Sequence, residues 1–208
     1  MCSFLYCIIF YIFIQVFYTR DMKIVIGLGN PEARYTGTRH NVGFAVLDHF
    51  ASTHRAIWKQ STKFKASTAE LSIAGEKITL VKPTTFYNLV GESARAIMDF
   101  YKLTLADVLI VHDDLALPLG TIRTRVGGSD GGNNGLKSLA LHIGTETARL
   151  RVGVWTDAHH AADKVSVVLG KLSKDEQATL DVQLPKAAKI IEQFATGNFE
   201  TTTHRAST

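Results

Sequence analysis

The chain has 208 residues, a length that fits one domain or at most two small ones and is sufficient for a full hydrophobic core. Its 23 basic and 19 acidic side chains give a formal net charge of +4, which permits a polyanionic partner but does not require one. Both cysteines, Cys2 and Cys7, lie at the N-terminus, which excludes a disulfide framework and a cysteine nucleophile in the rest of the chain.

The chain begins with an apolar and aromatic leader, residues 1–21, whose composition differs from that of the sequence after it. Its apolar run is slightly shorter than the roughly 20 residues of a membrane-spanning helix. The leader also lacks the basic start and the small-residue cleavage site of a signal peptide. Because a self-contained strand begins at Met22, we predict that the leader is an upstream extension, and a membrane anchor is the alternative. If the leader inserts, Arg20 and Lys23 on its C-terminal side would keep the following domain in the cytoplasm, so both interpretations place that domain in the same compartment.

Strand-like and helix-like segments alternate along the first half of the chain. A continuous apolar run that ends in glycine is typical of a strand buried on both faces of a sheet. Apolar residues three and four positions apart indicate one face of a helix, and a glycine turn between two strand-like runs predicts a β-hairpin. These patterns predict a strand at 23–28, a helix at 41–54, hairpin strands at 67–73 and 77–81, and a helix at 84–101.

The second half continues the alternation and defines the expected fold class. The predicted elements are strands at 108–114, 120–126 and 149–155, a glycine-rich loop before a short helix at 135–143, and a final helix opened by a capping box of Ser173 and Glu176. We therefore predict one α/β domain, residues 22–196, with a mixed, mostly parallel central sheet flanked by helices. Residues 197–208 form a polar tail that we expect to fray.

The turn after the first strand resembles a dinucleotide-binding turn only in part. Such a turn needs a third glycine where this chain has Glu32, and Pro31 removes a backbone donor that a pyrophosphate would use. A nucleotide cofactor is therefore not expected. Asn30 remains at the carboxyl end of a buried strand, where open α/β sheets place their ligand sites. A plain Asn-Pro turn is the alternative.

The glycine-rich segment 126–138 does not fit a phosphate-binding loop. Leu136 separates Gly135 from Lys137, whereas that loop requires Gly-Lys-Ser in succession. The acidic strand at 108–114 also precedes the segment, although it would be expected to follow. These departures argue against an NTPase and leave either a backbone that closely approaches a ligand or a surface loop.

His40 is the first candidate for acid–base chemistry, although a lone histidine is more often a surface or packing residue. Asp113, at the end of a central strand, can orient an imidazole and stabilise its protonated form. His40 and the run His112-Asp113-Asp114 could instead bind a metal, but the usual spacings of zinc-binding histidines are missing. We therefore predict no metal, and a metal-dependent hydrolase built on the run stays as an alternative.

Taken together, four stretches resemble the bacterial-type peptidyl-tRNA hydrolase family. They occur in the family's order and span about residues 22 to 196. The stretches are GLGNPEARYTGTRHNVGF (27–44), KPTTFYNLVGES (82–93), VHDDLALPLGTIRTRVGGSDGGNNGLKS (111–138) and RLRVGVW (149–155).

The resemblance implies hydrolysis of the ester that joins a peptide to the 3′ end of tRNA. It places the active histidine at His40 and the aspartate that orients it at Asp113. His40 would act as general base on a water molecule. The family's asparagines fall on Asn30, Asn88 and Asn134, which would position the water and hold the peptide backbone and the terminal adenosine. Direct attack by water agrees with the absence of a Gly-x-Ser-x-Gly elbow from the sequence.

The resemblance also implies contacts with the rest of the substrate. Arg125 and Arg151, on neighbouring predicted strands, would clamp the 5′ phosphate of the tRNA, and Lys164 would contact its backbone. Tyr35 and Tyr87 would lie beside the substrate. The implied partner is peptidyl-tRNA, bound by a monomeric enzyme that uses no cofactor.

Four positions depart from the family pattern. Glu32 replaces a glycine, Val90 a serine, Tyr87 the common methionine and Asn133 a histidine. Because the histidine and aspartate are intact, we predict slow-to-normal activity. A catalytically impaired RNA-binding module is a further alternative.

Overall fold

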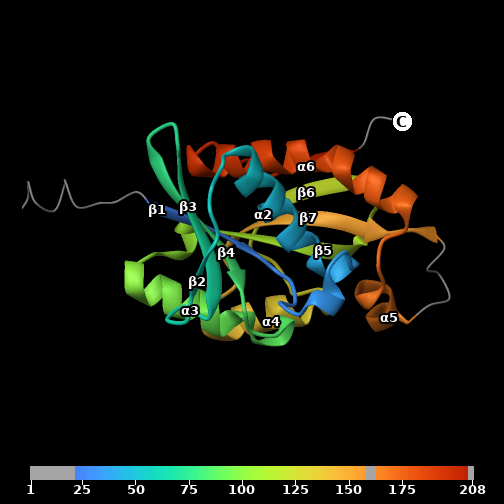
Figure 1. The fold of residues 1–208 in the computed structure, drawn as a ribbon, viewed down its shortest axis with the longest axis horizontal. Helices are drawn as coiled ribbons and strands as arrows, with labels where there is room; N and C mark the ends of the chain where they lie inside the picture. The colour runs from blue at the N-terminus through green and yellow to red at the C-terminus, as the bar shows by residue number, and fades with distance from the viewer. Residues whose placement is uncertain (1–21, 158–162, 206–208) are drawn as a thin grey trace, which may run out of the picture.

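The computed structural model describes residues 22–157 and 163–205, so the predicted leader lies outside the described residues. One sheet forms the centre of the molecule, and helices pack on both of its faces (Figure 1). The strands are β1 (Met22–Gly27), β2 (Lys59–Ser61), β3 (Ala66–Ile73), β4 (Glu76–Pro83), β5 (Val108–Pro118), β6 (Thr121–Val126), β7 (Ala148–Trp155) and β8 (Thr203–Arg205). The α-helices are α2 (Val42–Thr53), α3 (Val90–Tyr101), α4 (Asn134–His142), α5 (Lys164–Leu169) and α6 (Lys174–Ala195). The 3₁₀ helices are η1 (Ala33–Tyr35), η2 (Arg39–Asn41), η3 (Tyr87–Leu89) and η4 (Leu105–Asp107).

The strands lie in the order β2-β3-β4-β1-β5-β7-β6-β8. The pairings of β4 with β1, β1 with β5 and β5 with β7 are parallel, whereas the other four are antiparallel. The prediction of a mixed α/β sheet is confirmed, but the prediction of a mostly parallel sheet is wrong. The difference lies in β2 and β8, which were not predicted and add antiparallel pairs near the edges of the sheet, and in β6, which follows β5 after only Leu119-Gly120. A chain that turns back so soon runs antiparallel to the strand it has left.

Hydrophobic cores lie on both faces of the sheet. Successive side chains of a strand point to opposite faces. Val25 of β1 therefore packs with the buried residues of α2 and α6, while Ile24 and Ile26 pack with those of α3 and α4. The side chains of β5 alternate in the same way, with Val111 on the face covered by α2 and α6 and Ile110 on the face covered by α3 and α4. The two central strands are thus held from both sides, which gives the site at their carboxyl ends a rigid base.

The helices largely follow the predicted pattern. The helix expected at residue 84 begins at Val90, because the 3₁₀ helix η3 precedes it. Helix α6 begins with the predicted capping box: Ser173 Oγ accepts a hydrogen bond from the backbone of Glu176, whose carboxylate accepts one from the backbone of Ser173. The sequence analysis did not predict β2, α5 or β8. Within the described ranges, no helix combines the length and the apolar character needed to cross a membrane.

Residues 199–205 of the C-terminal tail pair with β6 and pack against α6, so the expectation that the tail frays is wrong for this part. Strand β8 pairs with β6, and Phe199 packs edge-on against Phe194 of α6. Thr124 Oγ1 of β6 also donates a hydrogen bond to the carbonyl oxygen of Glu200. Apart from Phe199 the tail has few apolar residues, so its sequence did not predict the strand that pairs with β6.

Candidate active site

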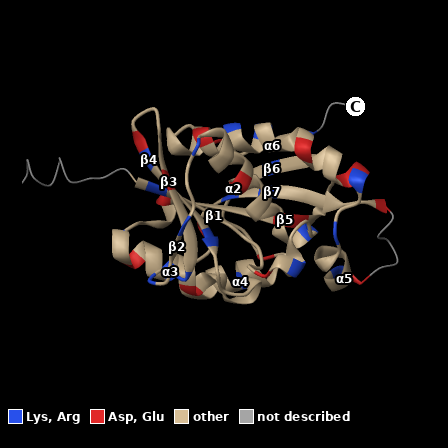
Figure 2. Cartoon of the chain, viewed as in Figure 1, with Lys and Arg blue, Asp and Glu red and all other residues tan. Residues whose placement is uncertain are grey.

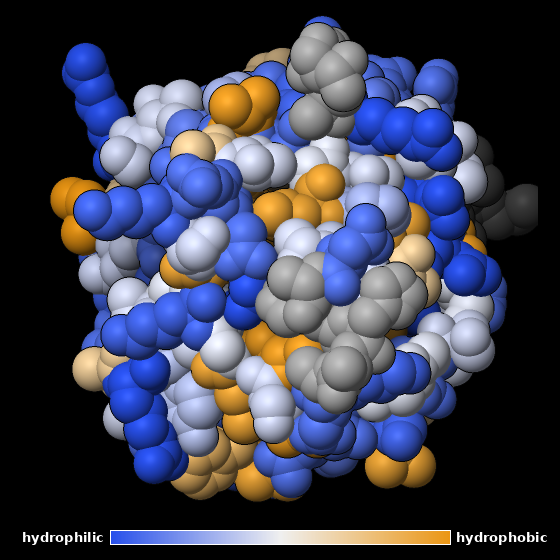
Figure 3. Space-filling view, turned by 90° about the vertical axis from the view of Figure 1, so that its right-hand side faces the viewer, coloured by the Kyte–Doolittle hydropathy of each residue, from blue (hydrophilic) through white to orange (hydrophobic). Residues whose placement is uncertain are grey.

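Parallel strands β4, β1 and β5 end at the same edge of the sheet, where open α/β sheets place their ligand sites. Asn30 follows β1, Tyr87 and Asn88 follow β4, and Asp113 lies within β5. The face at this end of the molecule has a central apolar area within a hydrophilic surround (Figure 3). The strand ends therefore bring together segments that are far apart in the sequence.

Helix α2 approaches the strand ends closely because Gly43, in its first turn, has no side chain. A Cβ atom at this position would lie 2.5 Å from the carbonyl oxygens of both Leu28 and Val111. Both neighbours are backbone atoms at the end of β1 and in β5, so neither can move aside cheaply. The contact fixes the start of α2 and also η2, which precedes it directly and carries His40.

We expect Gly43→Ala to lower the free energy of unfolding by about 1–3 kcal/mol, the usual range for overpacking a buried position. The added methyl group would push α2 and η2 away from the strand ends. Thermal unfolding should report the loss, and Ser52→Ala at the exposed end of α2 serves as the control. An unchanged melting temperature for Gly43→Ala would contradict the close approach.

The structure brings the predicted pair His40 and Asp113 together. Nδ1 of His40 lies 3.0 Å from Oδ2 of Asp113. The His40 side chain is 14% exposed and that of Asp113 only 3%, so the carboxylate is enclosed while the imidazole reaches solvent. None of the residues that the structure describes hydrogen-bonds to Nε2 of His40. This nitrogen is therefore accessible to a water molecule or a substrate.

Tyr87 contacts both members of this pair. Its hydroxyl donates a hydrogen bond of 2.6 Å to Oδ1 of Asp113, and its ring stacks on the His40 imidazole with 3.4 Å between ring centroids. Burial raises the pKa of the Asp113 carboxyl, but hydrogen bonds from His40 and Tyr87 outweigh burial and hold this pKa below its usual value. Burial and the nearby Asp113 charge raise the pKa of Tyr87 well above its usual value. Asp113 is thus anionic and Tyr87 neutral at neutral pH.

Asn30 lies beside the pair and is held by three hydrogen bonds. The Asn41 side chain accepts from the backbone N–H of Asn30 at 2.8 Å and donates to its carbonyl oxygen at 2.9 Å. The side-chain oxygen of Asn30 accepts from the backbone N–H of Tyr87 at 3.0 Å. This contact orients the amide group and leaves its NH₂ to donate to a ligand. Sequence reasoning missed the role of Asn41, although its place directly after His40 was a possible signal.

The other predicted contact residues lie on η1, η3, α4 and α5. Asn88 in η3 and Asn134 at the start of α4 are exposed, whereas Tyr35 in η1 is half-buried. The guanidinium of Arg34 lies over the ring of Tyr35, 4.8 Å from its centroid. Lys164 is exposed at the first residue of α5. All four side chains are therefore at least partly accessible, as a contact with a large substrate requires.

Arginines gather on one face of strands β6 and β7. Arg123 is paired in register with Arg151, and Arg125 with Arg149. Residues directly opposite one another on antiparallel strands point to the same face, as do residues two apart on one strand. The predicted phosphate contacts Arg125 and Arg151 therefore share a face.

Two of these arginines are held by neighbouring groups. Arg151 Nε donates to Asp114 at 2.6 Å, which gives this aspartate a role that was not predicted. Arg149 is buried and donates to the carbonyl oxygens of Gly128, Ser129 and Thr145, so it anchors the glycine-rich loop.

Basic positions on and beside α5 and at the adjoining end of α6 lie on one side of the molecule (Figure 2).

The run His112-Asp113-Asp114 does not converge on one point. Nδ1 of buried His112 bonds to the backbone carbonyl oxygen of Asp113, while Asp113 faces His40 and Asp114 faces Arg151. Burial lowers the pKa of His112. No group of three or more potential metal ligands occurs among the residues that the structure describes.

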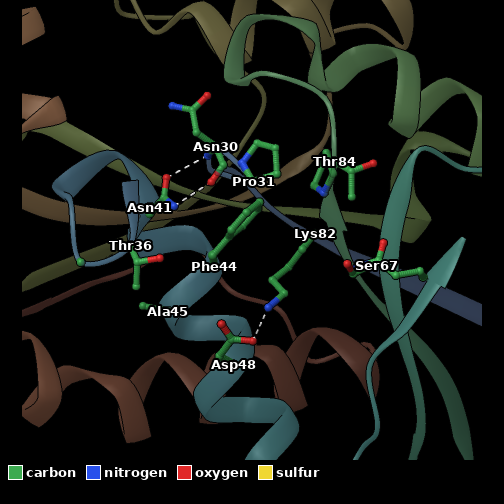
Figure 4. Close-up of a pocket in the computed structure, with 13 residues that line it drawn as sticks. Asn30, Pro31, Thr36, Asn41, Phe44, Ala45, Asp48, Ser67, Lys82 and Thr84 are labelled. Carbon is green, nitrogen blue, oxygen red and sulfur yellow. Dashed lines mark hydrogen bonds and ion pairs between the residues drawn. The ribbon is translucent and has the colours of Figure 1, made fainter. Parts of the chain in front are cut away.

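A cavity of about 290 Å³ adjoins the Asn30-Pro31 loop. Figure 4 shows the Asn30 side chain pointing away from the ion pair of Lys82 with Asp48 that lines this cavity. Its lining includes Phe44 and polar groups from α2 and β4, but neither His40 nor Asp113. The cavity thus adjoins the site through Asn30 and Asn41 but does not reach the histidine–aspartate pair.

The fold and the site together define an α/β enzyme with a histidine–aspartate pair at the carboxyl ends of its central strands. The chain belongs to the peptidyl-tRNA hydrolase family, whose model matches residues 24–208. The family predicted from the sequence is therefore confirmed.

Individual relatives match over nearly their whole length. The chain is 47% identical over 175 residues to a peptidyl-tRNA hydrolase of Listeria welshimeri, with 84% of this chain and 94% of the relative covered. It is 46% identical over 180 residues to one of Chlorobaculum parvum, with 86% and 94% covered. The crystal structure of peptidyl-tRNA hydrolase from Acinetobacter baumannii has a TM-score of 0.79 at 33% identity, with 86% of this chain and 91% of that one covered.

Proposed function

We propose that the chain hydrolyses the ester bond between a peptide and the 3′ end of tRNA. The observation that carries this proposal is the 3.0 Å contact between His40 Nδ1 and buried Asp113. A carboxylate at Nδ1 stabilises the tautomer whose Nε2 can accept a proton. The relatives named as peptidyl-tRNA hydrolases supply the reaction class.

In the proposed reaction, Nε2 of His40 takes a proton from a water molecule as the water oxygen bonds to the ester carbonyl carbon. The side-chain NH₂ of Asn30 donates to the carbonyl oxygen, which becomes negatively charged. The imidazolium, stabilised by Asp113, then gives its proton to the 3′ oxygen as the carbon–oxygen bond breaks. The products are a peptide with a free carboxyl group and a tRNA with a free 3′ hydroxyl group.

We assign the remaining contacts to the two ends of the substrate. Asn88 and Asn134 would hold the peptide backbone and the terminal adenosine, because carboxamides offer a donor and an acceptor without adding charge. Tyr35 and Tyr87 would line the path of the peptide. Their positions around the pair support this assignment.

Arg125 and Arg151 would bind the 5′ phosphate of the tRNA, and Lys164 would contact its backbone. The shared face of the arginines supports a common phosphate ligand, since guanidinium groups bind phosphate oxygens in pairs. Binding of this kind weakens with salt. We further propose that residues 22–196 form the catalytic domain and that the enzyme acts as a monomer in the cytoplasm, without a cofactor.

Incubation of the full chain with N-acetyl-aminoacyl-tRNA, with and without a chelator, tests the proposed function. We expect release of the N-acetyl amino acid and intact tRNA at equal rates in both reactions. Release that stops with the chelator would favour a metal-dependent hydrolase. Tight binding without release would favour an RNA-binding module.

A further inference from the structure

We propose that Tyr87 and Asn133 act as a coupled positioning pair that fixes Asp113 and moderates its hold on the protonated form of His40. The inference deepens the proposed function and rests on it. Its basis is a continuous chain of hydrogen bonds: Asn133 Nδ2 donates to Tyr87 Oη at 2.9 Å, and Tyr87 Oη donates to Asp113 Oδ1 at 2.6 Å. The other carboxylate oxygen of Asp113 faces His40.

The direction of the chain follows from its ends. The Asp113 carboxylate can only accept hydrogen bonds, so the buried Tyr87 hydroxyl must donate to it. The hydroxyl oxygen is then free to accept, and the Asn133 NH₂ supplies that donor. The Asn133 amide is itself oriented, because its oxygen caps α4 by accepting from the backbone N–H of Leu136. A fixed helix end therefore holds the hydroxyl in place.

The Tyr87 ring has little freedom to move. One of its faces stacks on the His40 imidazole at an interplanar angle of 14°. Its edge contacts the start of α4, where a Cβ atom on Gly135 would lie 2.5 Å from Tyr87 Cε1. The ring thus occupies a slot that exists because residue 135 is a glycine. Tyr87 and Asn133 are also two of the positions that depart from the family pattern, and here they contact each other.

The Tyr87 hydroxyl is a second donor to Asp113, beside His40, and it weakens the interaction between Asp113 and His40. Asp113 shares its negative charge between the Tyr87 hydroxyl on Oδ1 and His40 on Oδ2. Removal of the hydroxyl concentrates that charge on His40 and stabilises the imidazolium relative to the neutral base. The neutral base performs the proposed reaction. Without the hydroxyl, activity should therefore be lost at a higher pH as the solution is acidified.

Other charged groups near His40 do not depend on the Tyr87 hydroxyl. Buried His112 has a lowered pKa and is uncharged at neutral pH. Besides Asp113 and Tyr87, the charged and titratable groups on the surrounding elements are Asp114 and His112 of β5, Arg39 of η2 with Glu176 of α6, Arg151 of β7 and Lys164 of α5. Asp114 and Arg151 pair with each other, as do Arg39 and Glu176.

The test measures kcat/KM against pH for the wild-type full chain, Tyr87→Phe, Asn133→Ser and the double variant. Phenylalanine keeps the ring stack, and serine keeps a cap for α4 but is too short to bond the hydroxyl. We expect Tyr87→Phe to move the acidic limb of the profile up by about 0.3–1 pH unit, with KM changed less than about twofold. Asn133→Ser should move the limb in the same direction in the wild type and not at all in Tyr87→Phe.

Tyr101→Phe in α3 is the control, because its hydroxyl lies outside this chain of hydrogen bonds. A loss of packing would lower the melting temperature without moving the acidic limb. An unmoved limb in Tyr87→Phe, or an equal effect of Asn133→Ser in both backgrounds, would overturn the coupled pair.

A second measurement does not depend on activity. The titration of the His40 ring, followed by NMR in the wild type and in Tyr87→Phe, should shift in the same direction as the limb. If the wild type hydrolyses no ester but the His40 titration still shifts, the proposed function fails and the coupling to Asp113 survives. If the ester is hydrolysed and neither quantity shifts, the coupling alone is wrong.

Discussion

Replacing His40 with alanine is expected to lower kcat for hydrolysis of N-acetyl-aminoacyl-tRNA by about 10²–10⁴-fold, the usual contribution of a general base. The change removes the imidazole that we propose takes a proton from water, while Asn30 and the arginines of β6 and β7 stay in place. KM should therefore change much less than kcat. Steady-state kinetics at neutral pH, on protein shown to be folded by thermal unfolding, measures both quantities.

The matched control for this prediction is His49→Ala. His49 lies in α2, the helix that directly follows η2 and His40. It is half-buried, but it contacts neither Asp113 nor Tyr87. It should retain normal turnover. A His40→Ala protein that hydrolysed the ester at the original rate would exclude the mechanism, whatever the behaviour of the control.

Asp113→Asn should produce a related loss through a different route. An asparagine of the same shape can turn its NH₂ towards Nδ1 of His40 and favour the tautomer that carries a proton on Nε2, which cannot act as a base. The asparagine oxygen then faces the Tyr87 hydroxyl and still accepts from it, which favours this orientation of the amide. We expect kcat to fall by about 10²-fold or more, and single-turnover rates would separate this loss from slow product release.

The sequence was most informative where one local pattern determines one element. The apolar run of β1, the turn at Gly75 and the capping box of α6 each predicted their structure correctly. Strands β2 and β8 have three residues each and little buried apolar surface, so their structure depends on the strand beside them. The direction of β6 likewise depends on a two-residue turn rather than on the strand's own sequence.

The site was predictable in its parts but not in its contacts. His40 and Asp113 are 73 residues apart in the chain, and strand ends that meet at one edge of the sheet made their proximity a reasonable prediction. Sequence alone did not indicate that the Tyr87 hydroxyl would reach Asp113, since that depends on the side-chain slot at Gly135. The sequence also did not predict the ion pair of Asp114 with Arg151, because such a pair can be predicted only when the register between β5 and β7 is known.

The 3₁₀ helix η2, which carries His40, is also held by residues between α5 and the first turn of α6. Arg39, whose side chain is only 5% exposed, donates from Nη2 to both carboxylate oxygens of Glu176 at 2.6 Å. Its Nη1 donates to the carbonyl oxygens of Gly170 and Lys171. Burial works to raise the pKa of Glu176, but hydrogen bonds from Ser173 and Arg39 outweigh it and leave this pKa below its usual value.

Replacing Arg39 with alanine is expected to reduce the free energy of unfolding by about 3 kcal/mol, the lower end of the range for breaking a buried ion pair. The lower end applies because Glu176 keeps 16% side-chain exposure and its bond to Ser173. For a chain of this size the melting temperature should fall by about 6–12 °C. Arg34→Ala is the control: its ion pair with Glu32 is exposed, at 66% and 39%, and should be worth less than about 1 kcal/mol.

The stability difference between wild type and Arg39→Ala should also depend on pH. A carboxyl whose pKa is lower in the folded protein contributes stability above its unfolded pKa and loses that contribution as the pH falls through the folded value. The difference should therefore be largest at neutral pH and should shrink in acid, where Glu176 is protonated in both proteins. A difference that stayed constant down to acid pH would assign the effect of Arg39 to its two backbone carbonyl contacts rather than to the ion pair.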